Sequence, residues 1–198
     1  MPVKRKIYEF MVTLLDTKPA IWRRIQVPET YTFWDLHVAI QDSMGWLDCH
    51  LHAFRFGKGR PRWEIGIPDD DGFDDLRILP GWEVPISEYF DVGTECLYEY
   101  DFGDSWVHAL TLEGMLLAKK GQRYPVCLEG ERACPPEDCG GVGGYYRLLE
   151  ILSDPTHEEY DEFIAWLGGT HDPISFDPAK VKFDNPKKRW ESAFSGGI

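Results

Sequence analysis

Residues 6–28 read KIYEFMVTLLDTKPAIWRRIQVP, and residues 32–45 read TFWDLHVAIQDSMG. The first stretch contains two runs that alternate apolar and polar side chains on either side of the turn at residues 16–19. Alternation with a period of two predicts two strands joined as a β-hairpin. Pro28 ends the second strand, because proline has no amide hydrogen for a strand ladder.

The second stretch predicts an α-helix that begins after Thr32. Asp35 follows Thr32 by three residues, which forms a short capping box, and Gly45 is a C-terminal stop. The helix carries an apolar stripe of Phe33, Leu36, Ile40 and Met44. His37 lies on the apolar side and is predicted to be a core histidine. A further strand is predicted over residues 50–56.

Hairpin, helix and strand in this order predict an α+β fold with a β-grasp-like head, a mixed or antiparallel sheet and C-terminal helices. Short strands are also predicted over residues 63–67, 96–100 and 106–113. Residues 121–144 are rich in Gly, Pro and Cys, which favours an ordered loop. Helices are expected over residues 145–152 and after a capping box at Thr156–Glu159. The chain is predicted to be one domain over residues 1–198, with a less ordered tail at 179–198.

Composition narrows the function classes. No stretch approaches the ~18 consecutive apolar residues of a membrane helix, and no signal peptide is recognisable, so we expect a cytoplasmic protein without a membrane partner. Five cysteines, an odd number, favour free thiols or metal ligands over a disulfide framework. The net charge is -13, and residues 67–198 contain 27 acidic and 11 basic residues. This charge disfavours non-specific binding of nucleic acid.

The segment from Tyr98 to Glu113 contains the first candidate site. Asp101 and Asp104 flank a predicted hairpin tip, and His108 lies four residues further on. Carboxylates beside a histidine can bind a divalent metal or perform acid–base chemistry. The alternative is structural, since aspartate is common in turns and a histidine in a strand is often satisfied by its neighbours.

The cysteine-rich loop is the second candidate. Three thiols in a Gly/Pro-rich segment can hold zinc with a histidine as fourth ligand, although their spacing is not that of common zinc modules, and buried or loop thiols are the alternative. The three are Cys127, Cys134 and Cys139. Glu137 and Asp138 in this loop are the expected acidic partners of the first site.

Two weaker patterns remain. His50 and His52 are predicted to project from the same face of a strand, a spacing that metals use, and the alternative is that they are two polar strand-end residues near water. A local basic edge is also expected, made by Arg23, Arg24, Arg55, Lys58, Arg60 and Arg62.

Several short blocks along the chain resemble one family. They are Ile21-Trp22-Arg23-Arg24, Leu36-His37, Ile40-Gln41, Met44-Gly45-Trp46, His50-Leu51-His52 with Phe54, Tyr100-Asp101-Phe102-Gly103-Asp104-Ser105-Trp106 with His108, and Cys134-Pro135-Pro136-Glu137-Asp138 with Gly140-Gly141. In this order they are similar to the plasmid pRiA4b open-reading-frame-three-like family, over about residues 7–178. The resemblance implies a bacterial or archaeal α+β protein with no established activity. Some members carry a resolvase label, but this sequence has no serine nucleophile set among arginines near its N-terminus and no helix-turn-helix.

Three hypotheses for the function follow, and the sequence leaves open whether the chain is an enzyme. The first is a binding or interaction module associated with mobile or accessory genes, with an unknown protein or small molecule as ligand. Its contact surface joins residues 101–108 to 134–141, and the other binding candidates are Trp22, Arg23, Arg24, His52 and Trp106. The second is a metal-dependent hydrolase, such as a nuclease, which uses zinc or another divalent metal. Its candidate ligands or base are Asp101, Asp104, His108, Glu137 and Asp138. The third is a nucleic-acid-binding accessory protein that uses the basic edge.

Overall fold

The N-terminal hairpin forms where the alternation predicts it. The computed structural model describes residues 5–57, 63–68 and 77–194. Within it, β1 (Lys6–Leu14) and β2 (Ile21–Pro28) pair antiparallel. The more buried side chains alternate along both strands, because one face of the sheet packs against a helix. The predicted hairpin is confirmed to within one residue at each end.

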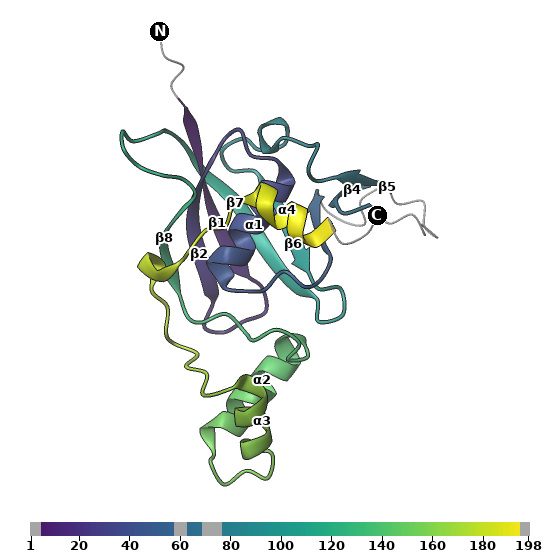
Figure 1. Ribbon diagram of the computed structural model, residues 1–198, viewed down its shortest axis with the longest axis vertical. Coiled ribbons are helices and arrows are strands. Elements are labelled where there is room, and N and C mark those ends of the chain that lie inside the picture. The colour runs from purple at the N-terminus through teal and green to yellow at the C-terminus, as the bar shows by residue number, and fades with distance from the viewer. Residues whose placement is uncertain (1–4, 58–62, 69–76, 195–198) are drawn as a thin grey trace.

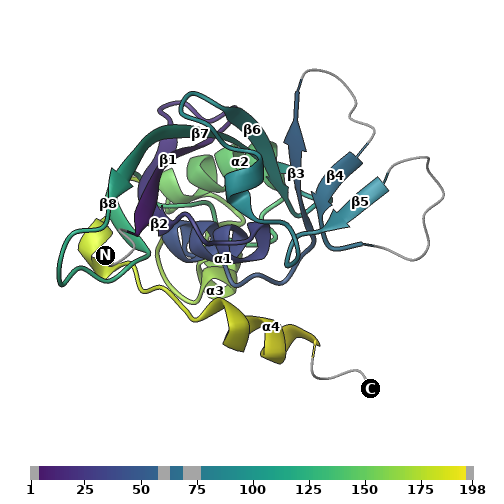
Figure 2. The same ribbon diagram turned by 90° about the horizontal axis from the view of Figure 1, so that it is seen from above.

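Helix α1 (Phe33–Met44) also begins and ends as predicted. The Thr32 hydroxyl accepts a hydrogen bond from the Asp35 amide at 3.2 Å, and the Asp35 carboxylate accepts one from the Thr32 amide at 2.9 Å. Gly45 closes the helix with φ of 98°, a conformation that favours glycine. Ten of the twelve helix residues are buried, since the sheet curves around α1 (Figure 2).

The described part of the chain contains one mixed eight-stranded sheet with the strand order β5-β4-β3-β6-β7-β1-β2-β8. All pairs are antiparallel except β4 with β5, which is parallel. The remaining strands are β3 His52–Phe56, β4 Trp63–Gly66, β5 Arg77–Pro80, β6 Glu95–Tyr100, β7 Trp106–Leu117 and β8 Val126–Glu131. The predicted α+β class is confirmed, whereas the β-grasp-like detail is not.

Two edge strands, β8 and β5, were not predicted from the sequence. β8 lies inside the segment that was expected to be a loop, and it pairs with β2 at one edge of the sheet. Half of its residues are exposed, so its sequence lacks a clear apolar alternation. β5 is a four-residue strand at the other edge and has no fully buried residue. Short edge strands bury little, and their formation depends on the neighbouring strand.

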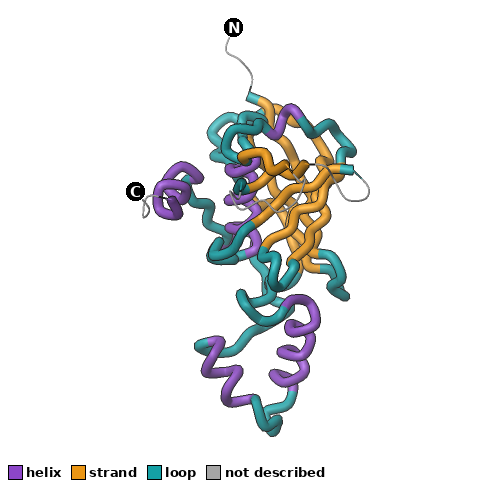
Figure 3. Tube along the Cα trace, turned by 90° about the vertical axis from the view of Figure 1, so that its right-hand side faces the viewer, coloured by secondary structure: helices purple, strands orange, loops and turns teal. Residues whose placement is uncertain are grey.

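Two helices form a separate lobe beyond one end of the sheet (Figures 1 and 3). They are α2 (Gly141–Ser153) and α3 (Tyr160–Leu167). The capping box predicted at Thr156 is wrong, because the Thr156 hydroxyl donates to the Asp154 carboxylate at 2.6 Å and α3 begins later. Gly168 ends α3 as predicted, with φ of 66°.

The chain then returns to the sheet body. After the 3-10 turn η2 (Pro178–Lys180), helix α4 (Pro186–Phe194) packs beside α1, where Trp190 meets Trp34 with ring centroids 5.1 Å apart. A second 3-10 turn, η1 (Ile86–Glu88), precedes β6. The tail expected to be less ordered therefore contains a helix over residues 186–194 that the sequence did not predict.

Aromatic side chains fill the space between α1 and the sheet. Phe33 of α1 contacts Phe54 and Phe90 edge-on or tilted, with ring centroids 5.0 and 5.9 Å apart. Phe54 in turn packs against Tyr98 at 4.9 Å. Such offset contacts stabilise a core beyond the area that they bury. In the described residues, no helix has both the length and the apolar character needed to cross a membrane.

Candidate metal centre

The two loops that the sequence singled out meet at one end of the sheet. The amide of Gly140 donates to the Asp104 carboxylate at 3.0 Å. A Cβ atom on Gly141 would lie only 2.5 Å from the Asp104 carbonyl oxygen, so the close contact requires glycine there. The β6–β7 hairpin tip and the segment before α2 therefore form one surface.

Asp101 stands at the hairpin tip with one carboxylate oxygen already used. Its Oδ1 accepts hydrogen bonds from the amides of Gly103 at 2.9 Å and Asp104 at 3.3 Å. Its backbone φ is 55°, in the left-handed region that aspartate tolerates better than most residues. These contacts fix the side chain, and its other oxygen, Oδ2, lies 3.6 Å from Nε2 of His50.

His50 comes from the segment between α1 and β3 and joins the two loops. Its Nε2 lies 3.0 Å from Oδ1 of Asp138 and 3.9 Å from Oε2 of Glu137. None of these contacts has hydrogen-bond geometry, so this buried nitrogen atom has no hydrogen-bond partner among the described residues. One ligand atom each from His50, Asp101 and Asp138 lies within 4.8 Å of the other two.

Glu137 connects the segments that carry the cluster residues through hydrogen bonds. Its Oε1 accepts a hydrogen bond from the Leu47 amide at 2.6 Å, and the Tyr100 hydroxyl lies 3.2 Å from both carboxylate oxygens. The Tyr100 hydroxyl also accepts from the Cys49 amide at 3.0 Å. Burial raises the pKa of Tyr100, which keeps this hydroxyl protonated as a donor to Glu137. Glu137 thus ties the segment that carries His50 to the loop that carries Asp138.

The donor set suits a divalent transition metal. One imidazole nitrogen and two carboxylate oxygens are ligands that Zn²⁺ and Mn²⁺ accept. Metal–ligand bonds of about 2.1 Å put opposite ligand atoms about 4.2 Å apart, so the observed 4.8 Å limit closes with small side-chain shifts. His50 and Asp138 keep 30% and 67% of their side-chain surface exposed, which leaves one side of the cluster open to solvent.

Asp104 and His108, which were also predicted to belong to the cluster, do not contribute ligand atoms to it. Asp104 holds Gly140 and is not one of the three grouped ligands. His108 is fully buried, with Nδ1 3.1 Å from the Trp106 carbonyl oxygen, and burial lowers its pKa to about 4. His108 therefore belongs to the core, and the expectation that it would join Asp101 and Asp104 is corrected.

His50 was expected to pair with His52 on a strand. The strand begins only at His52, so His50 lies in the preceding segment and points to the cluster, whereas His52 is buried. The ring of His52 stacks on that of His37, with centroids 3.5 Å apart and planes 9° apart. His37 is buried as predicted, with Nδ1 2.9 Å from the Tyr98 hydroxyl. The sequence signal for His50 was its position within a family block, not its spacing from His52.

The three thiols predicted as zinc ligands do not come together. Among the described residues they form no group of three candidate ligand atoms. Cys127 lies on β8, and burial raises its pKa to about 11. Cys134 and Cys139 pack against the core, where burial raises both pKa values. Because these three side chains bring no group of three ligand atoms together, the geometry does not support a three-cysteine zinc site.

The arginines of the predicted basic edge are already engaged. Arg23 is fully buried, and its guanidinium donates to the carbonyl oxygens of Trp22, Ser43, Glu131 and Arg132 at 2.8–2.9 Å. Arg24 pairs with Glu113 and Glu129, and Arg55 pairs with Glu64 and Glu99. Trp22 is half-buried beside Arg24, and Trp106 is buried. Lys58, Arg60 and Arg62 lie outside the described residues.

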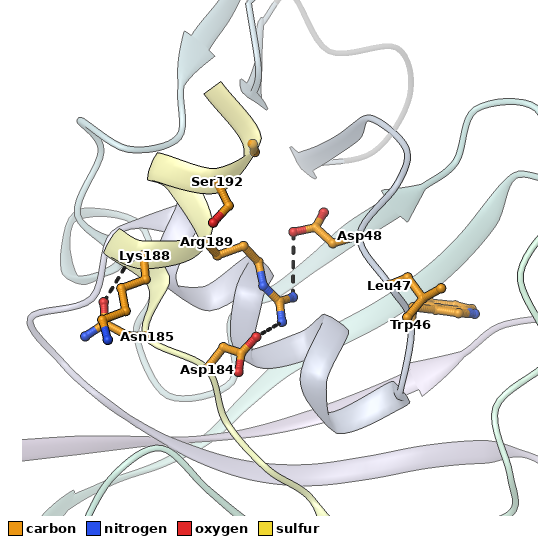
Figure 4. A pocket seen from close by; sticks show the side chains of 9 residues that line it. Trp46, Leu47, Asp48, Asp184, Asn185, Lys188, Arg189 and Ser192 are labelled. Atoms are coloured by element: carbon orange, nitrogen blue, oxygen red, sulfur yellow. Dashed lines mark hydrogen bonds and ion pairs between the residues drawn. The ribbon is translucent and has the colours of Figure 1, made fainter. Parts of the chain in front are cut away.

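A cavity of about 570 Å³ is lined by residues 46–48, which precede His50, and by residues of α4 and the segment before it (Figure 4). Arg189 of α4 reaches into it and lies 2.6 Å from both Asp42 and Asp184 and 3.7 Å from Asp48. Burial raises the pKa of Asp48 to about 6, although Arg189 acts in the opposite direction. Asp48 also lies 2.7 Å from Nε2 of His37. These contacts hold the segment that carries His50.

The curved mixed sheet around α1, with two loops joined at one end, makes this an α+β protein. The chain matches the plasmid pRiA4b ORF-3-like protein family over residues 6–184 and belongs to it. The uncharacterised protein y4hQ from Sinorhizobium fredii (strain NBRC 101917 / NGR234) is 36% identical over 186 residues, which are 92% of this chain and 89% of y4hQ.

A solved structure gives the same result. MM3350 from Methanosarcina mazei Go1, a protein of unknown function, is 44% identical, with a TM-score of 0.81 over 91% of this chain and 100% of the other. The family resemblance read from the sequence is therefore confirmed. These relatives have no established activity.

Proposed function

We propose that this protein is a cation-dependent binding module whose divalent metal is held by His50, Asp101 and Asp138. The observation that carries the proposal is the convergence of three ligand atoms, from three separate segments, within 4.8 Å. Like charges held this close repel each other, and a divalent cation removes that repulsion. The unpartnered Nε2 of His50 supplies the nitrogen donor.

The metal would present its open side to a ligand. The described surface nearby includes exposed apolar side chains at Leu47, Leu51 and Phe102. A ligand with an oxygen donor for the metal and an apolar portion for these side chains fits such a surface. An unidentified protein or small molecule of this kind is the proposed partner. We place the protein in the cytoplasm, because all five cysteines are free thiols.

Titration calorimetry with Mn²⁺ and Zn²⁺ tests the proposal. The wild-type protein should bind one equivalent, and His50→Ala and Asp138→Asn should each weaken binding strongly. Asp161→Asn is the matched control, because Asp161 is exposed on α3 and makes the same change of charge. Absence of metal binding by the wild type, or equal weakening in the control, would refute the proposal.

A metal-dependent hydrolase is the second candidate. The open side of the cluster favours it, since a catalytic metal needs a position for water or substrate. A panel of phosphodiesters and esters with added Mn²⁺ distinguishes the two candidates. Turnover that disappears in Asp101→Asn and persists in Asp161→Asn supports the hydrolase, whereas metal binding without turnover supports the binding module.

A further inference from the structure

The opposite end of the sheet contains a large pocket of different chemistry. It has a volume of about 930 Å³ and is formed by residues 5–7, 28–30 and 118–124. These are the start of β1, the end of β2 with its following turn, and the connection from β7 to β8. In Figure 1 this end lies at the top, near the N-terminus, and the α2–α3 lobe lies at the bottom.

The pocket is lined by five basic side chains and one carboxylate. The basic residues are Arg5, Lys6, Lys119, Lys120 and Arg123, and the carboxylate is Glu29. Lys6 pairs with Glu29 at 3.5 Å. The other four basic side chains make no ion pair with any carboxylate in the described part of the chain. Elsewhere, Arg24, Arg55 and Arg189 are all neutralised by two or more acidic residues.

Backbone hydrogen bonds hold the pocket walls together. The Ala118 amide donates to the Arg5 carbonyl at 2.9 Å, and the Glu29 amide donates to the Lys6 carbonyl at 3.1 Å. The Tyr124 hydroxyl accepts from the Lys119 amide at 3.2 Å, which closes the connection between β7 and β8. The basic side chains therefore extend from a fixed frame, and binding does not require the frame to fold.

We propose that this pocket binds a small ligand with two or more phosphate groups, such as a nucleoside diphosphate. Several unneutralised cations around one concavity attract a compact, multiply charged anion. The volume is in the range of pockets for small molecules and exceeds what one phosphate needs. A long polyanion fits less well, because the chain has a net charge of -13 and repels it beyond the pocket.

Calorimetric titration with pyrophosphate and ADP, each without added metal, tests this proposal. The wild-type protein should bind both with dissociation constants below about 1 mM, and more tightly than inorganic phosphate. The variant Lys119→Ala/Lys120→Ala/Arg123→Ala should bind at least about tenfold more weakly, since it loses three exposed charge contacts. All three side chains are exposed, so the fold is preserved, and circular dichroism verifies this.

The matched control is Lys180→Ala/Lys182→Ala/Lys187→Ala, which removes the same charge from exposed positions outside the pocket. It should retain wild-type affinity, and higher salt should weaken binding to the wild type. Three results would overturn the proposal: no saturable binding by the wild type, equal weakening in both triple variants, or tighter binding of a single-stranded oligonucleotide than of ADP.

Discussion

The two ends of the sheet hold charges of opposite sign in different ways. At the carboxylate end, defined by His50, Asp101, Glu137 and Asp138, backbone and tyrosine hydrogen bonds fix two of the three acids at short range. At the basic end, defined by the pocket around residues 118–124, long side chains extend from a fixed frame into solvent. This difference underlies our two proposals, which are a rigid site for a small cation at one end and an adaptable site for a larger anion at the other.

The largest expected effect is a loss of stability at acid pH, because histidines are buried in the folded core. Burial lowers the pKa of three of them in the folded state, namely His37, His52 and His108. Their contribution to stability is complete above their ordinary pKa of about 6.5 and is lost as the pH falls below it. Asp48, with its pKa raised to about 6, acts in the opposite direction and stabilises the fold as the pH falls through 6.

Between pH 7.5 and 5.5 the three histidines outweigh Asp48, so the free energy of unfolding should fall, by an amount on the order of 3 kcal/mol. Urea denaturation in EDTA at the two pH values measures this. Replacement of His108 by Gln should reduce the pH dependence even if it lowers stability at pH 7.5. A free energy of unfolding that rises toward pH 5.5 would contradict the account.

The second prediction separates the two ends directly. Asp101→Asn/Asp138→Asn should lower Mn²⁺ affinity by at least about a hundredfold, since even outer-shell partners of metal sites contribute up to that much. Both asparagines tolerate the positive φ that these positions adopt, so the loops should keep their shape. Pyrophosphate affinity should stay unchanged, and a parallel loss of both affinities would show that the two ends are not independent.

The third prediction tests the contact between the two loops. Gly141→Ala should lower the free energy of unfolding by about 2 kcal/mol and weaken Mn²⁺ binding, because the new Cβ meets the Asp104 carbonyl and φ is 67°. Gly143→Ala is the control, since its Cβ meets nothing within 4 Å and alanine favours the helix. Gly141→Ala should lower the melting temperature and weaken Mn²⁺ binding, whereas Gly143→Ala should do neither. Equal behaviour of the two variants in thermal denaturation and metal titration would argue against a required contact.

The smallest effect is expected at the basic end. Lys119→Glu alone should weaken ADP binding by about tenfold, because one repulsive charge replaces one attractive charge at an exposed position. Mn²⁺ affinity should not change, since the proposed cation site lies at the other end of the sheet. Calorimetry of the single variant with both ligands provides the measurement, and an effect on Mn²⁺ alone would reverse the assignment of the two ends.

The elements that local patterns determine could be predicted from the sequence. The hairpin and α1 follow from alternation and from the capping box at Thr32, and both are confirmed. The edge strand β8 and helix α4 depend on docking against β2 and Trp34, which no local pattern encodes. Arg23 was expected at a basic edge because of its charge, yet it is fully buried like Ile21 and Ile25 on the same strand.

The candidate site was predictable only in part. The acidic residues of the two loops stood out by type, and the structure brings Asp101, Glu137 and Asp138 near one another. His50 joins them because the segment after α1 contacts the hairpin tip, where the Asp101 amide donates to the Leu51 carbonyl oxygen at 3.0 Å. This contact depends on the tertiary fold and not on the local sequence. The basic pocket is formed by three segments that lie far apart in the sequence, so it could not be predicted from any single stretch of the chain.

The position of a bound metal tests the central claim most directly. Crystals grown with Mn²⁺ and measured for anomalous scattering should show one strong peak about 2.1 Å from Nε2 of His50 and from carboxylate oxygens of Asp101 and Asp138. The assignment of the metal centre would be contradicted if the protein binds Mn²⁺ in solution but the anomalous peak lies elsewhere. It would also be contradicted if no peak appears at saturating Mn²⁺.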